Sequence, residues 1–188
     1  MKKLFTIIMA ICFLMTTAIV SEAASLTNTL SNQIAVVIVG SADYKTKEFL
    51  NLTKDYFKPI DKSSVITVLS GKDVQNKYQK YWFDKGLIEE GTPTGKDFVE
   101  FVNYSGYNKV IYLVIKDSVL EQHGRKKGKD RSRISLSVNA FIVDRNNILE
   151  STSSTNDEDS KTSELRARRG AFKQCVKEIS EEFNPLLK

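Results

Sequence analysis

The chain is poor in the residues that most enzymes and metal sites use. Its 188 residues include two cysteines and one histidine. The sequence lacks an HExxH metal motif, a GxSxG nucleophile motif, a paired cysteine motif and a glycine-containing calcium loop. These absences remove the commonest hydrolase and metal-site signatures, so the sequence predicts no catalytic residues, no metal and no cofactor.

The first residues have the pattern of a secretory signal peptide. Lys2 and Lys3 precede an apolar run from Leu4 to Val20, and the small residues Ser21 and Ala23 follow at the positions that a signal peptidase reads. An uncleaved membrane anchor would fit the length of the run, but three threonines interrupt it. We predict cleavage after residue 23 and a periplasmic or secreted protein, with no transmembrane segment left.

Cleavage changes the charge and the cysteine count. Removal of residues 1–23 lowers Lys+Arg from 28 to 26 and Asp+Glu from 23 to 22, so the net charge falls from +5 to +4. A lipoprotein would need a cysteine directly after the apolar run, and Cys12 lies in its middle. Only Cys175 then remains, which excludes an internal disulfide and leaves pairing between molecules open.

The remaining residues predict one α/β domain over 33–184, between a flexible leading segment at 24–32 and a tail at 185–188. Apolar runs at 33–40, 64–70 and 109–117 predict strands. Helical spacing predicts helices over 41–57, 72–85 and 94–106, the last with Thr94 and Asp97 in a capping box.

The carboxy-terminal half has a different pattern. Alternation over 133–144 predicts a strand with Ile134, Leu136, Val138, Ala140 and Ile142 on one face, and a short strand follows at 148–153. A helix is predicted from about residue 160 or 163 to 183, with an apolar stripe that begins at Leu165 and with Asp157 to Asp159 before its start. The sum is one mixed sheet of about five strands with an antiparallel carboxy-terminal meander, packed by three to four helices.

A basic segment, EQHGRKKGKDRSRIS at 121–135, lies between two of these strands. It has six basic residues in nine positions: Arg125, Lys126, Lys127, Lys129, Arg131 and Arg133. One interpretation is a long, solvated hairpin connection. The other is a binding surface for an envelope protein, an anionic polymer or lipid head groups. Nucleic acid is disfavoured because no aromatic residue is interleaved for base stacking.

The alternative class of function is a secreted hydrolase whose nucleophile comes from residues distant in sequence. His123 could act as general base for Cys175 or for a serine, although Cys175 lies on an apolar helical stripe that favours an inert, buried thiol. Gly91 to Asp97 resembles a phosphate loop but has the wrong spacing. Tyr78, Tyr81 and Trp82 form either an aromatic ligand platform or part of the core.

Three segments resemble a known group of envelope domains. KVIYLVIKD, then ISLSVNAFIVDRNNILESTSS, then LRARRGAFKQCVKEISEEF resemble the periplasmic α/β domain of curli-secretion channel subunits, over about residues 33–183. The pattern is also similar to lipoprotein activators of penicillin-binding proteins and to the amino-terminal domain of the Tol-system propeller protein. The resemblance implies a hairpin turn at Asp144 to Leu149, no catalytic residues, and action by binding partners.

The chain departs from these families in two ways, because it has neither a lipidated cysteine nor a long amphipathic insertion that could build a pore. VQNKYQKYWFDKGLIEEGTPT and LRARRGAF also resemble uncharacterised exported proteins of Gram-negative-type Firmicutes, a resemblance that implies no activity. The sequence leaves the partner and the oligomeric state open.

Overall fold

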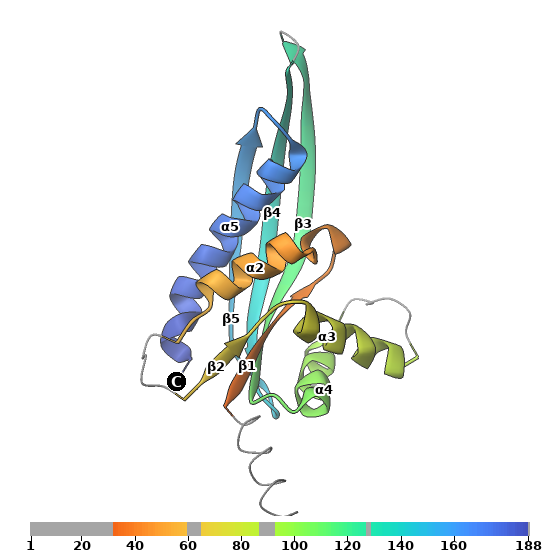
Figure 1. Cartoon of the computed structure of the whole chain (residues 1–188), viewed down its shortest axis with the longest axis vertical. Coiled ribbons are helices and arrows are strands. Elements are labelled where there is room, and N and C mark those ends of the chain that lie inside the picture. Colours follow the sequence, from red (N-terminus) through yellow and green to blue (C-terminus); the bar gives the residue numbers. More distant parts are fainter. Residues whose placement is uncertain (1–31, 60–64, 87–92, 127–128, 188) are drawn as a thin grey trace, which may run out of the picture.

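A computed structural model of the chain describes residues 32–59, 65–86, 93–126 and 129–187. The predicted signal peptide at 1–23 and all but the last residue of the segment 24–32 lie outside these residues. Figure 1 shows a twisted sheet with helices packed on both faces. The fold is therefore of the predicted α/β class.

The sheet has five strands in the order β2-β1-β3-β4-β5. Strand β1 (Gln33–Val39) runs parallel to β2 (Thr67–Leu69) and to β3 (Lys109–Lys126). Strands β4 (Lys129–Val143) and β5 (Ile148–Ser160) continue the sheet in antiparallel order. The predicted mixed sheet with an antiparallel meander is confirmed.

Four α-helices cover the sheet in the described part of the chain, and two short 3₁₀ helices, η1 (Ala42–Tyr44) and η2 (Asn184–Leu186), accompany them. Helices α2 (Lys47–Tyr56) and α5 (Glu164–Phe183) pack on one face, and α3 (Lys72–Asp84) and α4 (Gly95–Ser105) pack on the other. Because helices cover both of its faces, β1 is apolar at every position from 34 to 39, as a buried parallel strand requires.

Aromatic side chains fill both halves of the core. On the α2/α5 face, Phe49 and Phe172 meet edge to face with ring centroids 5.3 Å apart, and both contact Tyr44. On the α3/α4 face, Tyr78 and Phe101 meet in the same way at 4.9 Å. The aromatic side chains of α3 that could have formed a ligand platform belong to this second cluster and pack in the core: Tyr78, Tyr81 and Trp82.

Several element boundaries differ from the sequence prediction. Strands β3 and β4 continue through the segment predicted to be a loop, and β5 runs to Ser160 where a six-residue strand was predicted. Asp157 to Asp159 therefore belong to β5 and do not flank the start of α5, which Ser163 caps. Backbone pairing with β4 extends β5 through polar residues, since an edge strand needs few apolar side chains.

Other corrections concern single ends of elements. Strand β2 covers Thr67–Leu69 of the predicted 64–70, of which residue 64 lies outside the described residues; at its carboxyl end Gly71, with a φ of 120°, turns the chain into α3. Leu165, predicted on the apolar stripe of the last helix, is 52% exposed. Leu187 is buried in the core beside α5, so the segment predicted as a tail reaches the folded body.

The α3/α4 pair is joined by a small polar cluster. The Lys85 ammonium donates to Asp97 and Glu100, at 2.9 Å each, and Asp97 also accepts from the Thr94 backbone in the predicted capping box. Burial alone would raise the pKa of Asp97, but the hydrogen bonds from Thr94 and Lys85 lower it from 3.8 to about 2. The cluster fixes the carboxy-terminal end of α3 against the first turn of α4.

We expect Phe172→Ala to lower the free energy of unfolding by about 3 to 5 kcal/mol, because it removes the aromatic contact between α2 and α5 and leaves a cavity in the core. Leu165→Ala, an apolar truncation on the exposed side of the same helix, should change it by less than about 0.5 kcal/mol. Urea unfolding of both variants measures the difference. Equal effects would contradict the assigned packing of α5.

The lowered pKa of Asp97 predicts loss of stability in acid. Because the folded pKa of about 2 lies below the ordinary 3.8, its contribution, on the order of 2 kcal/mol, is present above about pH 4 and disappears between pH 4 and pH 2. Unfolding measured across this range should depend less on pH in Asp97→Asn. Asp55→Asn removes the same charge from the exposed side of α2, and equal flattening there would contradict the assignment.

Candidate functional site

The basic segment lies at the end of the β3–β4 hairpin. Strand β5 ends at Ser160, which pairs with Ser132, so the sheet beyond this point is two strands wide. We call residues 123–131 the hairpin tip. Figure 1 shows the hairpin projecting beyond α5 and β5.

The structure places five of the six predicted binding residues on the two strands of this hairpin. Arg125 and Lys126 lie in β3, and the others lie in β4: Lys129, Arg131 and Arg133. Lys127 lies outside the described residues. The backbone register pairs Lys126 with Lys129 and His123 with Arg131. The segment is therefore a continuation of the sheet, and the predicted long loop is wrong.

Net charge is concentrated in the hairpin tip. The tip has five basic residues and one acidic residue, a net charge of +4 with His123 neutral. The rest of 24–188 then has 21 basic and 21 acidic residues (26 less 5, and 22 less 1), so it is neutral overall. Arg133, just below the tip, donates to Asp157 at 2.6 Å.

The basic residues of α5 do not enlarge this surface to the same extent, because several are paired. Arg168 bonds Asp43 at 3.0 Å and Glu164 at 2.6 Å. Arg169 bonds Glu48 of α2 at 3.0 Å. These pairs hold α5 against η1 and α2, a structural use of the charges.

The sequence alternative of a Cys175–His123 pair is not supported. Cys175 is fully buried in α5, where its thiol donates to the carbonyls of Leu136 and Ser154 at 3.7 Å, and burial raises the pKa of the thiol. His123 pairs with Arg131, five residues along β4 from Leu136, which is about 16 Å at 3.3 Å per residue. The thiol lies in the core and far from the only histidine.

A second candidate site lies at the carboxyl ends of β1 and β2. The chain leaves β1 for α2 on one face of the sheet and leaves β2 for α3 on the other face. Neighbouring parallel strands whose connections diverge in this way open a crevice outside their carboxyl ends, where α/β proteins commonly bind ligands. Here the crevice holds a cavity of about 620 Å³.

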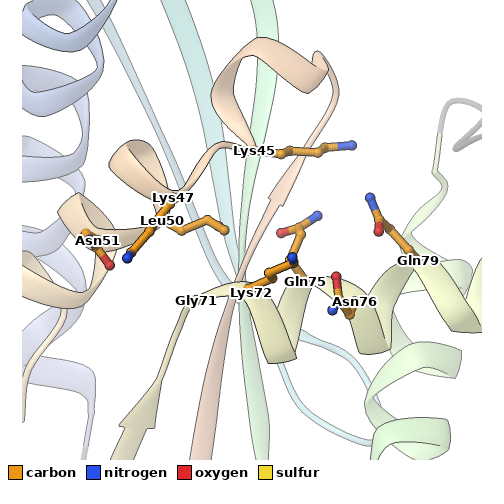
Figure 2. Close-up of a pocket in the computed structure, with 9 residues that line it drawn as sticks. All are labelled: Lys45, Lys47, Leu50, Asn51, Gly71, Lys72, Gln75, Asn76 and Gln79. Atoms are coloured by element: carbon orange, nitrogen blue, oxygen red, sulfur yellow. The ribbon is translucent and has the colours of Figure 1, made fainter.

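The lining of this crevice is basic and rich in amides. It has three lysines, four amide side chains, one leucine and one glycine, and no carboxylate: Lys45, Lys47, Leu50, Asn51, Gly71, Lys72, Gln75, Asn76 and Gln79. Figure 2 shows Leu50 of α2 and Gln75 of α3 pointing toward each other, with Lys47 pointing away from α3.

Gln75 forms the floor of the crevice and is not available to a ligand. Its amide donates to the Ile38 carbonyl at 2.8 Å and accepts from the Ile38 backbone N–H at 3.1 Å. Strand β2 pairs with β1 only as far as Ala35. On that side of β1, the buried Gln75 amide therefore bonds the Ile38 backbone in place of a neighbouring strand. This bond also fixes α3 relative to β1.

Sequence analysis missed the crevice because its residues come from two helices and a connection and look like solvated surface in the sequence. One signal was present, a glycine directly after each of two strand patterns, at Gly40 and Gly71. Both have positive φ in the structure. Such turns bring helix starts close to strand ends, where phosphate sites form.

No group of three or more His, Cys, Asp or Glu able to hold a metal occurs within 32–59, 65–86, 93–126 and 129–187. Among these residues, no helix combines the length and the apolar character needed to cross a bilayer.

No family model and no curated protein matches the chain. Among solved structures, it is similar to the lipoprotein GNA1162 from Neisseria meningitidis at 15% identity and a TM-score of 0.48, covering 81% of this chain and 98% of the other. A minor lipoprotein from Acinetobacter baumannii matches at 11% identity and a TM-score of 0.35, over 83% and 94%. The PelC dodecamer from Paraburkholderia phytofirmans matches at 12% and 0.34, over 82% and 87%.

All three identities lie below 25% and all three TM-scores below 0.5, so no function is transferred from these proteins. The similarities do not confirm the resemblance to curli-secretion, penicillin-binding-protein activator or Tol propeller domains, which stays a prediction.

The buried thiol yields a test of the cysteine assignment. In a protein of residues 24–188, we expect maleimide to label Cys175 at least about 100-fold more slowly in the native state than in urea, because reaction requires the helix to open. A Cys175→Ser/Leu165→Cys variant, with its thiol on the exposed side of α5, should react rapidly. Fast native labelling of Cys175 would restore it as a candidate nucleophile or as a site of pairing between molecules.

Proposed function

We propose that the chain is an exported, non-catalytic domain of the cell envelope that binds an anionic surface polymer through its hairpin tip. The single observation that carries the proposal is that the net positive charge of the domain lies on the part of the sheet that projects from it. The tip has a net charge of +4, equal to that of the whole predicted mature chain, and it lies on the two-stranded extension beyond β5. A charged extension of this kind attracts polyanions over several ångströms.

A polymer suits the tip better than a lipid bilayer. Residues 123–131 include no aromatic or aliphatic side chain other than that of histidine and the stems of lysine and arginine. Insertion into a membrane interface depends on apolar side chains, which the tip lacks. A chain of repeated phosphate or carboxylate groups needs only closely spaced cations.

Export and the absence of catalysis are supported by independent features. Residues 1–23 have the pattern of a cleaved signal, which would deliver the protein to the compartment where envelope polymers occur. The burial of Cys175 and its distance from His123 argue against the Cys175–His123 pair, which is one of the two nucleophile and base pairings that the sequence offered.

The test compares binding of the mature protein, 24–188, to immobilised poly(glycerol phosphate). The variant Arg125→Gln/Lys126→Gln/Lys129→Gln/Arg131→Gln should bind at least about 100-fold more weakly, since each cation near an anionic surface contributes about 1 kcal/mol. Binding of the unmodified protein should weaken from about 50 to about 300 mM salt.

A matched control removes four exposed lysines elsewhere, namely Lys54, Lys58, Lys161 and Lys173. It should retain binding, because it has the same net charge as the tip variant but an intact tip. Equal loss in both variants, or binding that salt does not weaken, would overturn the proposal. Binding to whole envelopes that protease treatment abolishes would point instead to a protein partner.

A further inference from the structure

We infer that the crevice between α2 and α3 is a binding site for a small phosphorylated sugar, separate from the hairpin tip. The cavity of about 620 Å³ falls within the range of small-molecule sites. It is on the opposite side of β1 from the antiparallel meander, because β2 is at one edge of the sheet and β3 to β5 follow β1 on the other side. The inference therefore does not depend on the proposed function.

The charge of the lining selects an anion. Lys47 and Lys72, from α2 and α3, have no acidic partner within ion-pair distance among the described residues. The acidic residues of the same two helix starts are directed elsewhere. Glu48 bonds Arg169 of α5, and Asp73 is not part of the lining. Lys47 and Lys72 are thus not neutralised by an ion pair within the part of the chain that the structure describes.

Backbone donors reinforce this preference. Helices α2 and α3 both begin at the crevice, and neither Thr46 nor Gly71 places a side-chain cap on their first N–H groups. The first N–H groups of a helix have no partner within the helix and attract phosphate.

The remaining lining residues select a polyol. Asn51, Asn76 and Gln79 both donate and accept hydrogen bonds, which suits sugar hydroxyl groups. Leu50 is the one apolar side chain, and the lining has no aromatic ring on which a nucleobase could stack. The combination favours a sugar phosphate over a nucleotide and over an uncharged sugar.

Calorimetry of the mature protein with glucose 1-phosphate tests the inference. We expect a Kd below about 1 mM, with glucose, inorganic phosphate and AMP each binding at least about tenfold more weakly. The variant Lys47→Gln/Lys72→Gln should lose at least about tenfold in affinity for glucose 1-phosphate. The control Lys54→Gln/Lys161→Gln, an equal change of charge at exposed positions that do not line the crevice, should not.

The amide side chains provide the second arm. Asn76→Ala/Gln79→Ala should weaken glucose 1-phosphate severalfold and leave inorganic phosphate unchanged, because it removes only contacts to hydroxyl groups. No binding of glucose 1-phosphate, or binding that the lysine variant does not weaken, would overturn the inference. Equal affinity for inorganic phosphate would overturn the sugar assignment. The hairpin-tip variant should bind glucose 1-phosphate normally, which separates this test from that of the proposed function.

Discussion

Burial of β1 on both faces is the constraint on which the rest of the fold depends. Six consecutive apolar residues, 34 to 39, leave no side of this strand that water can solvate. Alternate residues must therefore meet helices on opposite faces, and the chain supplies α2 and α5 to one face and α3 and α4 to the other. Because successive connections go to opposite faces, the crevice at the carboxyl end of β1 follows from the same requirement.

The sequence predicted best where burial imposes a period. The continuous run of β1, the helical spacing of α3 and α4, and the alternation in β4 each report which side of an element faces the core, and the structure confirms them. The capping box of α4 was predicted as well, since Thr94 and Asp97 interact through three residues of local chain. Helix capping and the burial of one face both depend on residues close together in the sequence, so both can be predicted from it.

Prediction failed where the partner strand supplies the structure. The ends of β3 and β4 and most of β5 are polar, so they have no apolar period, and only backbone pairing across the hairpin defines them. The crevice was not predicted from the sequence for a related reason. Lys47 and Lys72 have 24 residues between them in the sequence, and only the fold brings the starts of α2 and α3 to the same end of the sheet. A structure that forms only when two segments distant in sequence come together leaves no pattern in either segment alone.

The composition of β5 has a consequence for association between copies of the chain. As the last strand of the sheet, β5 has an outer row of backbone donors and acceptors that could pair with an identical edge. In a two-fold antiparallel pairing centred on Ser154, Glu150 of one copy would face Glu158 of the other. Like charges directly opposite destabilise a strand pair, so this edge discourages growth of the sheet into a larger, self-assembled one.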